Sequence, residues 1–493
     1  MSENKSDVVS FNLIDDPWIP VTWISKDDQK SSLISLQALF ERCNEISDLD
    51  CAPHERIAFT RLLVCITHSA LGTARASEWS AFVDPFPTDV IAYLKRAEVH
   101  KQFELLGEGA RFLQQAPARP KTETQYPLAK LGFYLVTGNN PKLRDHCGED
   151  PRDWSPAVAA RTILSLQNFF IGGSMASKVK GNGPSLKFLH TFVLGSNLKE
   201  TILKNCLNKE TIKRSGVELG KPVWEAPADD SLLARLVPMP CALWLSDDLA
   251  TTAIDQGYQY LEWDAAQDPF ATVIVGKGST KLKTELRLLR ANLNKGVWTD
   301  LHAITSQNSA DKGDRASSLE SYLGNYPDTT ETKLWVGELF KAKDAKIIDE
   351  IEATFTLPNE LFNAQSDASQ GLKAHIYKQG IDYADTISRK LYGAIKTYGK
   401  AVNHSDQPTA IAEQHYWDYL GARHEALIAV ATDPFALRGK PIGSKNANDD
   451  WTNLVKEAAL NALEYACPRS NPRQLSAYAA ARKFMYYALN PKI

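Results

Sequence analysis

The sequence has no hydrophobic run long enough to cross a membrane and no cysteine pair at metal-ligand spacing. No stretch approaches the roughly 18 uninterrupted apolar residues of a spanning helix. The N-terminus, MSENKSDVVS, is polar where a secretory signal needs an apolar segment. The seven cysteines form no CxxC pair, so in a reducing compartment they serve as small hydrophobic residues. We therefore expect a soluble, cytoplasmic protein.

The local motifs of common catalytic sites are also missing. The sequence contains no Walker A, GxSxG or HExxH motif, and its ten histidines do not cluster at metal-ligand spacing. The acidic pairs at positions 15–16 and 449–450 fall at a predicted turn and a predicted helix start, where carboxylates serve as caps. Adjacent side chains point apart and do not converge on one Mg²⁺. We predict that the protein is not an enzyme and holds no metal or cofactor.

An excess of positive charge is absent as well. The formal net charge is −3 at pH 7, which argues against a protein that coats nucleic acid indiscriminately. Two segments depart from this balance. Residues 172–199 contain four lysines and no acid, and residues 276–296 contain six basic residues and one acid. These segments are candidate surfaces for nucleic-acid phosphates.

The chain is long and has the composition of a folded protein. At 493 residues it exceeds the size at which one hydrophobic core keeps growing, so we expect two or three domains. Apolar spacing predicts short strands within residues 11–23 and helices at 55–71 and 157–170. Strand-like and helical pieces alternate irregularly over residues 186–300, and the polar stretch 306–318 is expected to be a solvated surface excursion.

The pattern changes after about residue 371. Strand signals fade, and apolar residues three and four apart predict four helices, separated by turns that contain Pro or Gly; the helices span residues 383–403, 410–431, 451–465 and 472–489. The predicted fold class is therefore α+β: a large mixed α/β body, residues 1–370, followed by a C-terminal four-helix bundle, residues 371–493.

One run near the N-terminus, NLIDDPWIPV at residues 12–21, resembles the opening signature of the CasA family. Later segments are similar to further landmarks of that family, in the family's order; these are residues 191–203 (TFVLGSNLKETIL), 222–224 (PVW), 268–270 (DPF), 296–301 (GVWTDL) and 412–427 (AEQHYWDYLGARHEAL). The resemblance covers most of the chain. Several weak motifs in one order carry more weight together than any of them alone.

CasA is the large subunit of the type I-E CRISPR Cascade, and the resemblance implies an α/β body, a C-terminal four-helix bundle and no chemistry. It implies recognition of the protospacer-adjacent motif in double-stranded DNA, the start of strand separation, and docking of a helicase-nuclease. The implied partners are duplex DNA, the 5′ handle region of the guide RNA, the handle-holding subunit, the small-subunit dimer and the backbone subunits. The residues alone also leave open a stand-alone nucleic-acid-processing enzyme and a scaffold that binds only proteins.

The first implied site is a glycine-rich loop at residues 172–184. Glycines let a backbone approach a minor groove closely, and nearby lysines can reach the flanking phosphates. The residues assigned to this loop are Gly172, Gly173, Lys178, Lys180, Gly181 and Gly183. Without the resemblance, a flexible surface loop explains the same composition.

The second site is a turn with lysines after the strand-like run ATVIV. The family has a motif-contacting lysine in the matching place, which is Lys277, with Lys281 close behind it. In the alternative interpretation, Lys277 is only a surface residue of a hairpin, and Lys281 or Lys283 contacts a phosphate instead.

The third site is a strand-separating wedge. The resemblance implies a hairpin whose tip forces the first base pair apart, and the spacing of LWVGELFKAKDAKIIDE places that tip at Lys343, Asp344 and Ala345. Relatives carry a glutamine and an asparagine there, which this chain lacks. An amphipathic helix that starts near Asp344 is the competing interpretation.

The fourth site is the poorly periodic segment 128–146. The resemblance implies that it docks on the subunit that holds the guide RNA, through Phe133, Tyr134 and Leu135. These three side chains can instead be buried within their own domain. Basic residues of the predicted bundle are candidates for facing the small subunits or the displaced strand, although charged helix surfaces are usually only solvated; they are Arg389, Lys390, Lys396, Lys400, Arg473, Arg482 and Lys483.

Overall fold

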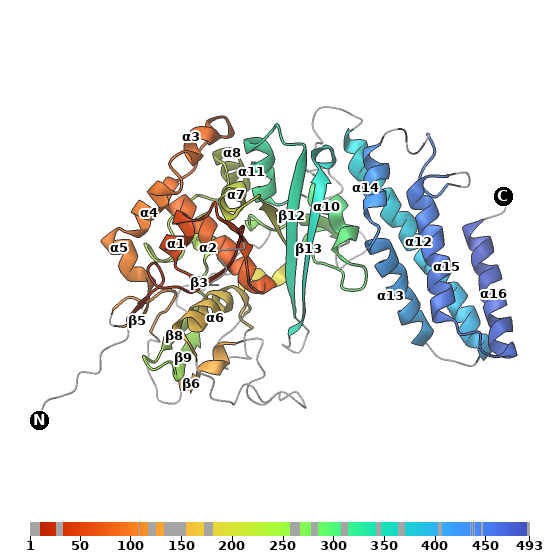
Figure 1. Ribbon diagram of the computed structural model, residues 1–493, viewed down its shortest axis with the longest axis horizontal. Coiled ribbons are helices and arrows are strands. Elements are labelled where there is room, and N and C mark those ends of the chain that lie inside the picture. The colour runs from red at the N-terminus through yellow and green to blue at the C-terminus, as the bar shows by residue number, and fades with distance from the viewer. Residues whose placement is uncertain are drawn as a thin grey trace, which may run out of the picture.

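The computed structural model combines a mixed α/β body with a helical C-terminal part (Figure 1), which confirms the predicted fold class. The structure describes residues 10–25, 33–107, 109–116, 125–132, 154–171, 181–256, 267–277, 284–306, 314–341, 347–362, 370–402, 407–433, 435, 437, 439–444 and 447–490. No single helix in this described part is long and apolar enough to cross a membrane, and one bent pair, Pro53–Leu71 with Ala76–Val83 at 78°, meets that test by length and composition alone.

The body is built from short strands and helices in irregular order. Its elements are β1 (Phe11–Asn12), β2 (Ile19–Trp23), β3 (Leu33–Ile34), α1 (Leu36–Glu41), β4 (Ile46–Leu49), α2 (Pro53–Leu71), α3 (Trp79–Val83), α4 (Thr88–Leu94), α5 (Ala97–His100), β5 (Glu104–Leu106), β6 (Gln125–Pro127), α6 (Pro156–Phe169), β7 (His190–Leu194), α7 (Leu198–Lys204), α8 (Lys209–Ser215), α9 (Leu232–Leu236), β8 (Cys241–Leu245), β9 (Thr251–Gln256), β10 (Val273–Lys277), β11 (Thr284–Leu288), α10 (Leu301–Thr305), α11 (Ser317–Asn325), β12 (Glu331–Lys341) and β13 (Ile347–Pro358).

Helix α2 is the central helix of the body. Pro53 stands in its first turn, where a missing N–H costs nothing, and the Glu55 carboxylate accepts a hydrogen bond from the Ala52 N–H at 3.3 Å. Nearly every side chain from its second turn onward is buried, so the helix is covered on all sides. The helices predicted at 55–71 and 157–170 are confirmed as α2 and α6.

A three-stranded antiparallel sheet, in the order β13-β12-β7, separates two hydrophobic clusters. Alternate side chains of β12 enter different clusters, because successive residues of a strand face opposite sides. Trp335 and Leu339 pack into the cluster that fills the body, whereas Leu334 and Val336 pack into the one that continues among the C-terminal helices. Figure 1 shows the β12–β13 hairpin standing between these two parts of the molecule.

The C-terminal helices are α12 (Gln370–Val402), α13 (Gln407–Gly421), α14 (Glu425–Thr432), α15 (Asp450–Ala466) and α16 (Pro472–Leu489). The predicted helix 410–431 is interrupted by a turn and forms both α13 and α14. At this turn Gly421 lies against Trp298 of the body, where an added Cβ would stand 2.9 Å from the indole nitrogen. Trp298 also packs against Trp417 and Trp451, at 6.0 and 5.8 Å between ring centroids, and thereby joins the body to the bundle.

The structure bears on the solvated excursion predicted for residues 306–318, and it leaves the predicted division into domains untested. The solvated excursion predicted for residues 306–318 is wrong for its described end, because Arg315 is only 9% exposed and Ser318 is buried. Arg315 donates to the carbonyl of Phe362 at 2.6 Å and pairs with Glu320, which offsets the cost of burying its charge. The division into domains at residue 370 stays a prediction, and the hydrophobic cluster of the bundle extends to residues of the body such as Val193.

Candidate nucleic-acid interface

The glycine-rich loop is described only at its two ends. Gly172, Gly173, Lys178 and Lys180 lie outside the described residues. At the ends, Ile171 and Asn182 form an isolated antiparallel bridge, and the Gly183 N–H donates to the Phe170 carbonyl at 2.7 Å. The segment 172–181 therefore leaves and re-enters the body at one fixed point.

Both described glycines of the loop, Gly181 and Gly183, stand where a side chain would be strained or would clash. Gly181 has φ +80°, a conformation that side chains rarely adopt. A Cβ on Gly183 would lie 2.2 Å from the Asn168 carbonyl oxygen. Directly after Gly183, the 3₁₀ helix Pro184–Lys187 packs against β12, so the root of the glycine loop lies beside the central sheet.

Strands β10 and β11 form the hairpin that carries the lysine turn. Lys277 pairs with Thr284 as the last described pair of this hairpin, so residues 278–283 join the two strands. Lys281 lies outside the described residues, and the side chain of Lys277 is not described either. The choice between Lys277 and its neighbours as the DNA contact stays a prediction.

The third segment lies in a long hairpin. Strands β12 and β13 pair from Glu331 with Pro358 up to Lys341 with Ile347, and residues 342–346 connect them. Lys343, Asp344 and Ala345 lie outside the described residues. The interpretation of a helix starting near Asp344 is wrong, because Ile347 already begins a strand.

The end of this hairpin projects beyond the sheet. Strand β7 pairs with β12 only over Lys333–Gly337, so the last four residues of β12 have β13 as their described strand neighbour. Figure 1 shows the hairpin running between the body and the C-terminal helices. The wedge assignment of residues 343–345 stays a prediction.

An ion pair ties the lysine hairpin to this longer hairpin. Arg290, two residues after β11, donates through Nε to the Glu338 carboxylate of β12 at 2.6 Å, and the Ala291 N–H donates to the same carboxylate at 2.9 Å. Burial raises the pKa of the Glu338 carboxyl, and the two donors partly oppose this rise. The described residues that flank the three predicted DNA-facing segments thus all lie in β12 or contact it.

The segment 268–270 (DPF) contributes to the core beneath this sheet. Arg61 of α2 is fully buried and pairs with Asp268 at 2.9 Å. Its remaining donors reach the Leu236 and Arg235 carbonyls at 3.1 and 2.6 Å. Sequence reasoning missed this pair, because nothing local links residues 207 positions apart.

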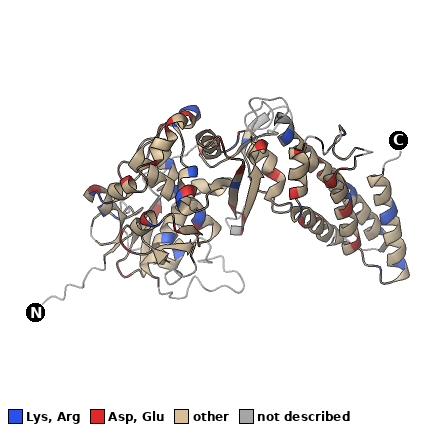
Figure 2. Ribbon diagram, turned by 45° about the horizontal axis from the view of Figure 1, so that its top comes forward, with Lys and Arg blue, Asp and Glu red and all other residues tan. Residues whose placement is uncertain are grey.

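The structure tests neither the predicted docking residues nor the predicted role of the basic bundle residues. Phe133, Tyr134 and Leu135 lie outside the described residues, so the docking hypothesis stays a prediction. The seven basic residues proposed for the bundle are all exposed, and α16 contains no acidic residue. Figure 2 shows Lys and Arg interspersed with Asp and Glu over the body. Two interpretations of the basic bundle residues therefore stay open: they are only solvated, or they face partner subunits or the displaced strand.

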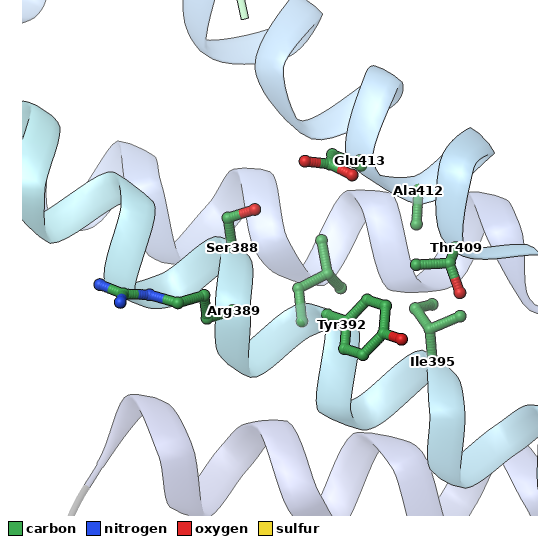
Figure 3. A pocket seen from close by; sticks show the side chains of 8 residues that line it. Ser388, Arg389, Tyr392, Ile395, Thr409, Ala412 and Glu413 are labelled. Carbon is green, nitrogen blue, oxygen red and sulfur yellow. The ribbon is translucent and has the colours of Figure 1, made fainter. Parts of the chain in front are cut away.

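No metal-binding group emerges from the residues that the structure covers. Among them, no three or more His, Cys, Asp or Glu side chains converge so that they could hold a metal ion. A half-open cavity between α12 and α13 has Leu391, Ile395 and Ala412 as its apolar lining. Arg389 and Glu413 also line it, but Figure 3 shows that their charged ends do not point toward each other. This cavity offers no acid–base pair.

The comparisons with known proteins decide the family. The family model described as "CRISPR-associated protein Cse1" matches residues 12–462. The chain belongs to the Cse1 family. A relative described as CRISPR-associated protein CasA/Cse1, from Thermus thermophilus, is 26% identical over 92% of this chain and 91% of its own length.

Solved structures of Cse1 proteins share the fold. The crystal structure of CasA from Thermus thermophilus aligns with a TM-score of 0.74 at 22% identity, over 98% of this chain and 100% of that one. Cse1 from Acidimicrobium ferrooxidans aligns with a TM-score of 0.72 at 18% identity, over 98% of both chains. A chain of a structure titled "CRISPR RNA-guided surveillance complex" aligns with a TM-score of 0.74 at 18% identity, over 97% of this chain and 99% of that one.

Several segments that indicated the Cse1 family have structural roles in this chain. Trp18 of the opening run is fully buried, and its indole N–H donates to the Leu13 carbonyl at 2.9 Å. Trp224 of the PVW segment donates to the Tyr93 hydroxyl at 2.8 Å. Trp298, in the segment 296–301, is buried as well.

Proposed function

We propose that this chain is the non-catalytic large subunit of a type I-E CRISPR surveillance complex. In this role it recognises the protospacer-adjacent motif in double-stranded DNA, starts strand separation for guide-RNA pairing and helps to recruit the target nuclease. Membership of the Cse1 family supports the assignment. One observation supports the proposal that the chain reads DNA. The described residues that flank the glycine loop, the lysine turn and the connection of the long hairpin all lie in β12 or contact it.

The shared root gives the three segments complementary tasks. A glycine loop and a lysine can contact the groove and phosphates of an intact duplex. A hairpin tip beside them can unstack the adjacent base step, at a cost of a few kcal/mol. The body then reads and opens DNA without any covalent chemistry, and the guide RNA supplies the sequence specificity through base pairing.

The proposed partners follow from the same role. They are duplex DNA, the 5′ handle region of the guide RNA, the handle-holding subunit, the small-subunit dimer, the backbone subunits and a helicase-nuclease. The net charge of −3 makes binding within the complex more effective than binding by the isolated chain, because few counterions would be released by this protein alone.

Lys277→Ala tests the lysine turn. In the reconstituted guide complex we expect the variant to bind a motif-containing duplex roughly 10- to 100-fold more weakly, since one groove or phosphate contact is worth about 1–3 kcal/mol. The measurement is the Kd for target duplex by electrophoretic mobility shift. Lys213→Ala removes an exposed lysine of α8 and serves as the matched control. Equal affinities of both variants and the parent complex would contradict the assignment of Lys277.

A further inference from the structure

The C-terminal bundle separates its charges by helix. Residues 386–402 of α12 contain four basic residues and no acid, and α16 contains three basic residues and no acid. In contrast, α13 contains two acids and no Lys or Arg, and α15 contains three acids and one lysine. Helix surfaces that are only solvated usually mix both signs. Solvation alone therefore does not account for this separation.

The two basic stretches lie side by side. Helix α16 packs along α12, and Arg473 Nε donates to the Ala401 carbonyl at 2.8 Å, near the end of α12. A Cβ on Gly393 would stand 3.1 Å from the Phe484 ring, so this ring lies against the middle of the basic stretch of α12. Figure 2 shows α16 with Lys and Arg but without Asp or Glu. We call the exposed surface of residues 389–400 and 473–487 the α12–α16 face.

Aromatic rings are exposed among the cations of this face. Tyr392 is 49% exposed, Phe484 is 42% exposed and Tyr487 is 46% exposed. Lys396 Nζ lies 5.8 Å from the centroid of the Tyr392 ring, and Lys483 directly precedes Phe484. Helix α16 buries a strip of only five residues, so most of its side chains face outward. A cluster of half-exposed rings is typical of an interaction surface.

Within the described part of the chain, the cations of the α12–α16 face have no carboxylate partners. Earlier in α12, by contrast, Lys378 pairs with Asp382 at 2.7 Å. Arg389 donates to the Asp385 carbonyl and to the Thr386 hydroxyl, both at 3.3 Å, and both acceptors are uncharged groups of its own helix. The face therefore presents positive charge that an anionic partner can neutralise.

The α12–α16 face ends where α13 begins. Glu413 of α13 and Tyr392 of α12 both line the half-open cavity between these helices. Figure 3 shows them on the two helices that border the cavity. A chain of phosphates is attracted by the cations of α12 and α16 and repelled by the carboxylate of Glu413. An anionic chain is therefore expected to follow α12 and α16 and to avoid α13.

The composition of the face favours single-stranded nucleic acid over a protein. Lysine is depleted at protein interfaces, whereas four of the exposed cations here are lysines, at positions 390, 396, 400 and 483. Proteins that bind single strands combine a positively charged surface with aromatic rings on which bases stack. An intact duplex keeps its bases stacked on one another and would leave these rings unused.

We propose that the α12–α16 face binds the DNA strand that becomes unpaired when the target duplex opens. The inference rests on the proposed function, because opening of the duplex supplies this strand while the other strand pairs with the guide RNA. Tyr392, Phe484 and Tyr487 stack on its bases, and the surrounding Lys and Arg side chains contact its phosphates. A strand held here re-pairs more slowly with the target strand, so the opened state lasts longer.

The first test measures binding of a fluorescent oligothymidylate by the purified full-length chain. We expect Y392A/Y487A to bind it roughly 10- to 100-fold more weakly than the parent, the usual effect of losing base–aromatic stacking. The control is Y465A, which removes a 66% exposed ring of α15. We expect K396A/K483A to reduce the dependence of the affinity on salt, whereas K209A/K213A, which removes two exposed lysines of α8, does not. Thermal melting verifies that all variants fold.

The second test measures the lifetime of the reconstituted guide complex on two targets. One is a complete duplex, and the other keeps the duplex flank but lacks the protospacer part of the strand that becomes unpaired. We expect Y392A/Y487A to shorten the lifetime roughly tenfold on the complete duplex, on the scale of one lost stacking contact, and to leave it unchanged on the other target. Y465A behaves as the parent on both.

Three outcomes would overturn the proposal. One is equal oligothymidylate binding by Y392A/Y487A and Y465A, and another is an equal lifetime of these two variants on the complete duplex. The third is an equal loss of lifetime on both targets, which would assign the face to a partner protein. If the parent complex shows no preference for the flanking motif, the proposed function fails, and oligothymidylate binding by the chain alone still decides whether the face binds single strands.

Discussion

Replacing Asp268 with alanine is expected to lower the free energy of unfolding by about 3–5 kcal/mol, the usual cost of leaving a buried charge without its partner. Arg61 is completely buried and pairs with Asp268 at 2.9 Å. The same carboxylate accepts from the Phe270 N–H at 3.1 Å, so the turn at 268–270 also loses a contact. A loss of this size is a large part of the stability of a typical protein.

Chemical denaturation of the purified chain measures this effect. The matched control is the double variant R61M/D268L, which removes both charges and fills the space with apolar side chains. We expect it to be more stable than D268A, since a buried pair is often replaced at little cost while a broken pair is not. Equal stability of D268A and the parent chain would show that water reaches Arg61 and that the core beneath the sheet is looser than described.

Replacing Asp300 with asparagine is expected to stabilise the protein at alkaline pH. Burial, with smaller contributions from Asp385 and Glu338, raises the pKa of Asp300 to about 7, although Lys295 opposes the rise. Its Oδ2 is buried without a hydrogen-bond partner among the described residues. Ionisation of Asp300 therefore lowers the free energy of unfolding. A rise in pKa of about three corresponds to a loss of about 4 kcal/mol at a pH well above 7.

The sign of the pH dependence follows from proton binding. Between the ordinary Asp pKa of about 4 and about 7, folded Asp300 holds a proton that the unfolded chain has released. Its contribution to the unfolding free energy therefore falls as pH rises through this window. The advantage of D300N should be about 2–4 kcal/mol at pH 8 and should shrink toward zero near pH 4.

Thermal melting at pH 5 and pH 8 checks this prediction. Asp418→Asn, at an exposed position of α13, is the control for the loss of one negative charge. A melting temperature of D300N at pH 8 that is equal to or below that of the parent would show that Asp300 has a partner when ionised.

The sequence predicted the elements whose apolar pattern is strong and local. Helices α2, α6, α15 and α16 were found because apolar residues recur along them without interruption. The break between α13 and α14 was missed, because it depends on Trp298, which reaches Gly421 from a distant part of the chain. Tertiary contact overrides a local helical pattern in that case.

The candidate interface was predictable only in part. Strand β12 has cores on both faces, so it lacks the alternation of a half-buried strand, and only the family resemblance pointed to the hairpin. The burial of Glu338 has no local sequence signal, because its partner Arg290 is 48 positions away along the chain. The glycine and lysine positions came from the resemblance and from local charge, whereas their common root at β12 required the structure.

The most direct test of the central claim is target-DNA binding by the guide complex with and without this chain. The duplexes differ only in the flanking motif, and Kd is measured at several salt concentrations. We predict that adding the chain creates a preference of at least roughly tenfold for one flank, the scale expected when a few base-pair contacts discriminate, with affinity that falls as salt rises. Binding that is indifferent to both the chain and the flank would contradict the proposal that this Cse1 protein reads the motif.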